Sequence, residues 1–160
     1  MHDALNAHIE EEMYSSNLYL AMAAYCESVN FKGFSHWMRI QAKEEYAHAM
    51  KIFDYLIDRG GRVQIRAVTE PPNEYKSPRD VFEKTLAHEK DVTKKVHKLY
   101  ELALQEKDYA TQALLQWFIT EQVEEEKTSR QIVDTLRTIG TNTSGLYMLD
   151  RELGRRGQAG

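Results

Sequence analysis

The chain has 160 residues, a length that suits one domain and leaves no room for separate substrate and cofactor modules. With 42% hydrophobic and 29% charged residues it can form one core, which excludes the class of intrinsically disordered chains. The net charge of -4 excludes the basic excess typical of nucleic-acid binding, and a single cysteine excludes metal sites built from several thiolates of one chain.

The N-terminal segment shows no targeting signal, since acids stand where a secretory signal carries lysine or arginine and then an apolar run. Nowhere is the apolar sequence long enough for a membrane helix. We therefore expect a soluble protein of the cytoplasm that binds neither membranes nor nucleic acid.

Two long helices are predicted in the first part of the chain. Apolar residues recur at helical steps over about 3–28, and the segment 30–33 interrupts them. Ser35 can act as the N-cap of a second helix over about 36–58, which Gly60 and Gly61 end. Short loops of this kind join antiparallel helices.

The segment 61–77 differs in composition, because its Glu70-Pro71-Pro72-Asn73 stretch forbids a helix. A stretched segment of this length can run from one end of a long helix pair to the other. We interpret it as a crossover that lets the second and third helices lie parallel.

Two further long helices and a short one complete the prediction. Ser77 and Pro78 open the third helix, which reaches about 105, and the fourth runs over about 110–139 with Leu114 on its inward face. A short fifth helix is predicted at about 146–154. The expected fold is all-α, a four-helix bundle with one long crossover between helices 2 and 3, forming a single domain over 1–160 with the bundle at about 3–139.

Carboxylates interrupt the apolar stripe of every long helix. Glu12 lies on the stripe of the first helix and Glu89 on that of the third, at positions where apolar residues are expected. The second helix places Glu45 and His48 three residues apart and so on one face. The fourth helix has Glu121 and Glu125 on its inward line, with Gln122 and Glu124 to either side.

Several carboxylates buried together must protonate or meet a cation, because each loses hydration and repels the others. Arginine and lysine are scarce on these lines, so the pattern predicts metal ions, with iron, manganese or zinc favoured by oxygen and imidazole ligands. A Glu-x-x-His pair with single glutamates from other helices is the ligand pattern of di-metal helical bundles. A solvated helix face is the alternative, and it stays open for Glu121 and Glu124.

Four separated strings resemble the non-haem bacterial ferritins, in order and over essentially the whole chain. They are Glu12-Met-Tyr-Ser-Ser-Asn-Leu-Tyr19, Gln41-Ala-Lys-Glu-Glu-Tyr-Ala-His48, His88-Glu89 and Phe118-Ile-Thr-Glu-Gln-Val-Glu-Glu-Glu126. The resemblance implies a ferritin-like bundle with a short fifth helix.

The same resemblance implies roles for individual residues. Glu12, Glu45 and His48 would hold a first iron, and Glu45 would bridge to a second iron held by Glu89 and Glu125. Gln122 would lie beside the pair, and Tyr19 would supply an electron or a hydrogen bond. A third iron site would use the four glutamates Glu44, Glu121, Glu124 and Glu125.

In function, the resemblance implies a ferroxidase that oxidises Fe(II) with O₂ or H₂O₂ and stores ferric mineral in a hollow shell of roughly twenty-four subunits. Haem is not expected, because Tyr46 stands where the bacterioferritins have their haem-binding methionine. Two alternatives are a ferritin-like di-metal oxidase or peroxide-scavenging protein without storage, and a structural shell subunit without a catalytic centre. Glu106 and Asp108 lie at a turn where ferritin channels admit iron, or are ordinary acids of an exposed turn.

Overall fold

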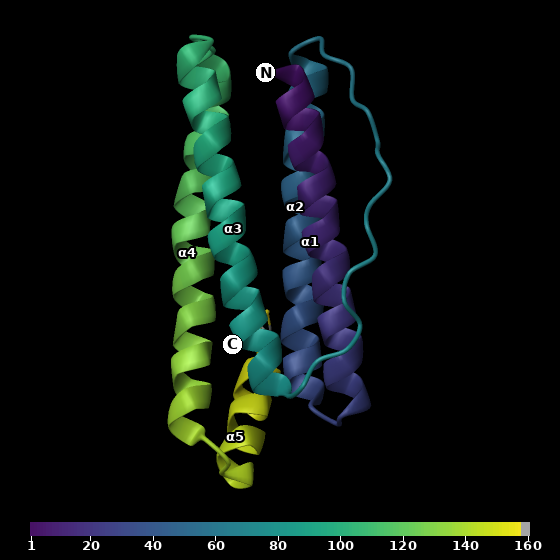
Figure 1. The fold of residues 1–160 in the computed structure, drawn as a ribbon, viewed down its shortest axis with the longest axis vertical. Helices are drawn as coiled ribbons and strands as arrows, with labels where there is room; N and C mark the ends of the chain where they lie inside the picture. Colours follow the sequence, from purple (N-terminus) through teal and green to yellow (C-terminus); the bar gives the residue numbers. More distant parts are fainter. Residues whose placement is uncertain (158–160) are drawn as a thin grey trace. The chain divides into compact units, whose positions relative to one another are not determined.

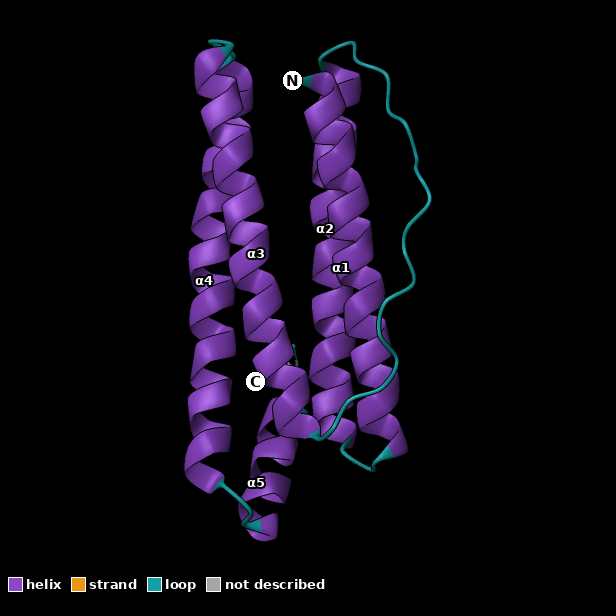
Figure 2. Ribbon diagram, in the orientation of Figure 1, coloured by secondary structure: helices purple, strands orange, loops and turns teal. Residues whose placement is uncertain are grey.

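The computed structural model describes residues 1–157, within which all regular secondary structure is helical (Figures 1 and 2). The helices are α1 (His2–Ser28), α2 (Lys32–Asp58), α3 (Pro78–Gln105), α4 (Tyr109–Ile139) and α5 (Thr143–Leu153). They form two compact units: His2–Pro78 with the segment that begins at Thr141, and Arg79–Gly140. No helix among residues 1–157 is long and apolar enough to cross a membrane.

In the first unit, α1 and α2 form an antiparallel hairpin (Figure 1). Ser16 Oγ donates a hydrogen bond of 2.7 Å to the Ala42 carbonyl, and Glu12, one turn earlier in α1, lies against His48, two turns later in α2. Apolar side chains at helical spacing are buried on both helices; they include Leu5, Ile9, Leu18, Met22, Phe34, Met38, Ile52 and Leu56. Their burial is the main stabilising contribution to these helices, as in most amphipathic pairs.

The predicted crossover is confirmed as an extended segment that follows α1 along its length (Figures 1 and 2). Near the start of α1, the Asn6 side chain donates to the Arg62 carbonyl at 3.0 Å and accepts from the Gln64 amide at 2.7 Å. Near the end of α1, the rings of Tyr25 and Tyr75 lie 5.3 Å apart. The side chain of Asn6 thus gives this irregular backbone some of the hydrogen bonds that a helix would supply internally.

The fifth helix docks on the start of α2. Asp150 Oδ1 accepts a hydrogen bond of 2.9 Å from the Phe34 amide, which is one of the N-terminal amides of α2 that have no partner within the helix. The predicted N-cap at Ser35 is therefore wrong, because α2 begins at Lys32 and Ser35 is buried inside it. A carboxylate distant in sequence performs the capping, and α5 begins at Thr143 rather than at the predicted residue 146.

In the second unit, α3 and α4 are also antiparallel. Gln112 donates to the Ala103 carbonyl at 3.1 Å near one end, and the ion pair of Arg137 with Glu83 spans 3.5 Å near the other. Asp108 caps α4 by accepting from the Thr111 amide at 3.1 Å, after Lys107 has turned the chain with a φ of 55°.

The predicted inward face of α4 needs one correction, because Leu115 is fully buried and Leu114 only half-buried.

Candidate metal centre

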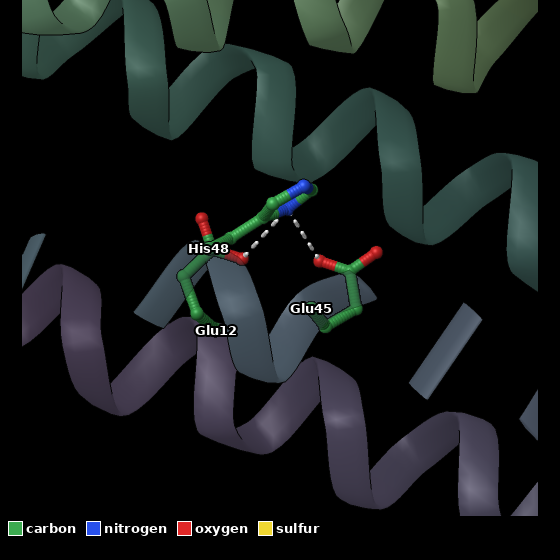
Figure 3. A group of neighbouring side chains, drawn as sticks. All are labelled: Glu12, Glu45 and His48. Carbon is green, nitrogen blue, oxygen red and sulfur yellow. Dashed lines mark ion pairs between the residues drawn. The ribbon is translucent and has the colours of Figure 1, made fainter. Parts of the chain in front are cut away.

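Glu12, Glu45 and His48 lie together inside the α1–α2 hairpin (Figure 3). One ligand atom of each residue lies within 4.8 Å of the others, and among residues 1–157 this is the one group of three or more such ligands. His48 Nδ1 is 3.3 Å from Glu45 Oε2 and 4.0 Å from Glu12 Oε2. The exposed fractions are 1% for Glu12, 2% for Glu45 and 6% for His48, so water solvates none of them well.

The helices explain why these three side chains converge. Glu45 and His48 are three residues apart on α2, so both point from one face. Glu12 points toward them from the inward face of α1 (Figure 3). Regular backbone positions all three side chains, which favours a fixed geometry.

The Glu12 carboxylate lies between two imidazoles. On one side, His8 Nε2 is 3.0 Å from Glu12 Oε1, one helical turn earlier; on the other is His48. Burial acts to raise the pKa of Glu12, but the neighbouring His8 and then His48 outweigh it and hold that pKa below its ordinary value of 4.5. Glu12 is therefore an anion at neutral pH.

These residues fit a metal ion. No hydrogen-bond donor among residues 1–157 reaches Glu12 Oε2, although this oxygen is buried and faces the group. A buried carboxylate oxygen needs a donor or a cation, and a cation bound by Glu45 Oε2, Glu12 Oε2 and His48 would meet this need. Oxygen and imidazole ligands without thiolate suit iron, manganese or zinc.

Glu89, Gln122 and Glu125 lie in the α3–α4 unit and form the second part of the predicted site. Gln122 Nε2 donates to Glu89 Oε2 at 3.1 Å and to the Glu89 carbonyl at 3.2 Å. Glu89 is 1% exposed and Glu125 is 6% exposed. The prediction that Glu89 and Glu125 interrupt an apolar face is confirmed, and Gln122 donates directly to one of the two carboxylates.

The other predicted residues lie in different surroundings. Tyr19 is fully buried, two turns after Glu12 on α1. Glu44 is half-buried and forms an ion pair with Arg156, and Glu121 is also half-buried. Glu124 is exposed and lies 3.2 Å from Lys127.

Two residues near the site had no signal in the sequence strong enough to single them out. His8 contacts Glu12 four residues on, and this spacing of four was the available signal. Arg156 lies beyond the last predicted helix, and it contacts Gln41 of α2, one turn before Glu45. No local pattern predicts such a contact over more than 100 residues.

The all-helical fold and the buried group of two carboxylates and a histidine define a helical-bundle protein with a candidate metal site. Residues 2–139 match the family model described as a ferritin-like domain. The chain belongs to the ferritin family.

Known relatives agree with this assignment. The bacterial non-heme ferritin of Staphylococcus haemolyticus is 42% identical over 154 residues, which cover 96% of this chain and 93% of that protein. The protein of the same name from Staphylococcus aureus is 40% identical with the same coverage.

Solved structures show the fold. The open pore ferritin of the hyperthermophilic archaeon Archaeoglobus fulgidus is 52% identical and superposes with a TM-score of 0.97, over 98% of this chain and 96% of that one. An engineered closed form of the same ferritin gives the same TM-score and identity. The fold class is therefore the ferritin four-helix bundle, and the function is iron storage; ferroxidase activity and shell formation are typical of the family.

Proposed function

We propose that this chain is a ferroxidase that oxidises Fe(II) at a pair of sites within each subunit. The observation that carries the proposal is the buried group of Glu12, Glu45 and His48, whose ligand atoms lie within 4.8 Å of one another. These three residues would bind one iron. Glu45 would also bridge to a second iron, whose other ligands would be Glu89 and Glu125, with Gln122 holding the Glu89 carboxylate.

Iron is the substrate of this reaction and the cargo of the protein. Each Fe(II) gives up one electron, so two irons together reduce O₂ to H₂O₂, or H₂O₂ to water, with two protons taken up. The carboxylates favour Fe(III) over Fe(II), because hard anionic oxygen ligands stabilise the higher charge.

We also propose a third iron site. It would use Glu44, Glu121, Glu124 and Glu125, and iron would have to compete with Arg156 for Glu44 and with Lys127 for Glu124. Exposed ion pairs are weak, so the competition at Glu124 is slight. The buried phenol of Tyr19 would supply a hydrogen bond or an electron beside the irons; the alternative is an ordinary aromatic side chain of the core.

We further propose a homo-oligomeric shell of roughly twenty-four subunits that holds the ferric mineral. A location in the cytoplasm stays a prediction. The main alternative is a di-metal oxidase or peroxide-scavenging protein of the same fold without storage. Iron loading separates the two, since a shell takes up many irons per subunit and an oxidase about two.

The test is the initial rate of Fe(II) oxidation in the variant that combines Glu45→Ala with His48→Ala. We expect a fall of more than about tenfold, because both ligands from α2 are lost. Asp54→Ala removes an exposed carboxylate from the same helix and should leave the rate unchanged. An unaltered rate in the double variant would refute the proposed site.

A further inference from the structure

Residues 154–157, which follow α5, lie along α2 through contacts of Arg156. The guanidinium carbon lies 4.3 Å from the centre of the Trp37 ring, a distance at which a cation is attracted to an aromatic face. His36 Nε2 donates to the Arg156 carbonyl at 3.0 Å. Backbone and side chain of Arg156 are thus both held on the first half of α2.

From there the guanidinium reaches two polar side chains one turn apart on α2. One nitrogen, Nη1, donates to Gln41 Oε1 at 2.9 Å, and the other, Nη2, forms an ion pair with Glu44. The fork of the guanidinium suits this double contact, which a lysine ammonium would make less well.

Gln41 connects Arg156 to Glu45 of the candidate metal centre. Its Nε2 donates to Glu45 Oε1 at 2.9 Å, and both side chains are buried. The direction of the amide is determined by its neighbours, because Arg156 can only donate and the Glu45 carboxylate can only accept. Glu45 Oε1 is therefore held by Gln41, and Oε2 is the oxygen that faces His48.

We propose that Arg156 is a positioning residue of the metal centre, which acts through Gln41 to hold the Glu45 carboxylate in the orientation that binds the metal. The inference rests on the proposed function, in which Glu45 bridges two irons. The tail after α5 then supports the ferroxidase site: Arg156 acts on Glu45 through Gln41, and it also pairs with Glu44, a ligand of the proposed third iron site.

The charge of Arg156 and its positioning role predict opposite effects of its removal on metal affinity. This difference makes the inference testable. By charge alone, removal of a cation near the site strengthens the binding of a metal cation. By position, removal of Arg156 lets the Gln41 amide turn and the Glu45 carboxylate lose its orientation, which weakens binding. Residues that orient metal ligands contribute about tenfold or more to affinity.

The experiment titrates Co(II) into the full-length, metal-free protein and records both calorimetric heat and the visible absorption of the bound ion. Arg156→Met should weaken Co(II) binding about tenfold and change the absorption, which reports coordination geometry. Gln41→Met should have a similar effect. The two substitutions together should weaken binding no more than either alone, because they interrupt one chain of contacts.

Three further variants make each outcome decisive. Arg155→Met removes an exposed arginine from the same tail and should bind Co(II) as the wild type does. Arg156→Lys keeps the charge and should recover only part of the affinity, so it supports the inference even where Arg156→Met folds poorly. Equal or tighter Co(II) binding by both Arg156 variants, or fully additive losses with Gln41→Met, would overturn it.

The variant with Glu45→Ala and His48→Ala separates this inference from the proposed function. If that variant binds Co(II) as the wild type does, the metal centre itself is wrongly assigned. If it loses binding while the Arg156 variants keep it, the centre stands and only the positioning role fails.

Discussion

At the scale of single residues, the centre depends on how Glu12 is stabilised as a buried anion. The carboxylate has His8 at 3.0 Å on one side and His48 at 4.0 Å on the other. Without such neighbours, burial of an anion costs about several kcal/mol, because the ion loses its hydration. His8 is thus a partner of Glu12 within α1, whereas His48 is shared with the proposed metal site.

Replacement of His8 by leucine should destabilise the metal-free protein by about 1 to 3 kcal/mol at neutral pH, because a buried carboxylate loses its nearest partner. His8→Gln should cost less, since the amide can still donate. Urea unfolding at a fixed protein concentration measures both. His97→Leu, at an exposed position of α3, serves as the control.

The pH dependence of this effect has a definite sign. The pKa of Glu12 is lowered in the folded state, so the anion stabilises the fold above its ordinary pKa of 4.5 and stops doing so as the pH falls through the lowered value. The difference between wild type and His8→Leu should therefore be present at pH 7 and disappear in acid. A difference that grows in acid would contradict this account.

The single cysteine gives a second prediction at this scale. Burial, and then the neighbouring charge of Asp150, raise the pKa of the fully buried Cys26 thiol to about 12 from an ordinary 9.0. Since the thiolate is the nucleophile, iodoacetamide at pH 9 should modify the folded protein far more slowly than the urea-unfolded chain. Mass spectrometry of the alkylated protein measures both rates, and equal rates would contradict the burial.

The same shift makes the fold less stable in alkali. Between pH 9 and about 12 the unfolded chain releases the thiol proton and the folded chain keeps it. The folded state then binds more protons, so this group lowers the free energy of unfolding as the pH rises. Cys26→Ala should show a smaller loss over that range.

At the scale of elements, α5 depends on a close approach to the start of α2. A Cβ on Gly33 would lie 1.7 Å from the Asp150 carbonyl oxygen, which is a backbone atom and cannot turn aside. Asp150 is also the residue whose side chain caps α2, by accepting a hydrogen bond from the Phe34 amide. The two helices can lie this close only because position 33 has no side chain.

Gly33→Ala should therefore detach α5 from α2, and with it the tail that carries Arg156. Amide hydrogen exchange of residues 143–153 should become faster, and Co(II) affinity should fall as in Arg156→Met. Gly60→Ala is the control, since its Cβ meets open space and only its φ of 68° is strained, at a cost of about 1 kcal/mol. Unchanged exchange in α5 would show that the docking tolerates a methyl group.

At the scale of the whole molecule, an apolar groove on the α1–α2 hairpin bears on assembly. The groove has a volume of about 560 Å³, and its lining includes Leu20, Ile40 and Tyr46. Leu20 is 50% exposed and Tyr46 is 51% exposed, and exposed apolar side chains that gather in one groove mark an interaction surface. A second copy of the chain is the partner expected in a ferritin shell.

Leu20→Glu should therefore prevent or weaken assembly, because a charge buried between subunits has no partner. Sedimentation velocity should show small species in place of a complex of roughly twenty-four subunits. Gln131→Glu adds the same charge at an exposed position of α4 and should assemble normally. Normal assembly of Leu20→Glu would place the groove outside the subunit contacts.

The helices themselves could be predicted from the sequence, because their causes are local. Apolar periodicity and the scarcity of glycine and proline define α1 to α4 to within a few residues, and Pro78 marks a helix start that the structure confirms. The carboxylates on the apolar faces were visible for the same reason. A charge at an inward position of a regular helix can be recognised from spacing alone.

Only the tertiary structure decided what these side chains contact. Spacing placed Glu45 and His48 on one face, but their proximity to Glu12 depends on the packing of two helices. The Asp150 cap on α2 and the Arg156 contacts with Gln41 and Glu44 join residues more than 100 positions apart. Such contacts have no local signature, because they arise when separate helices pack and bring distant polar groups within hydrogen-bond distance.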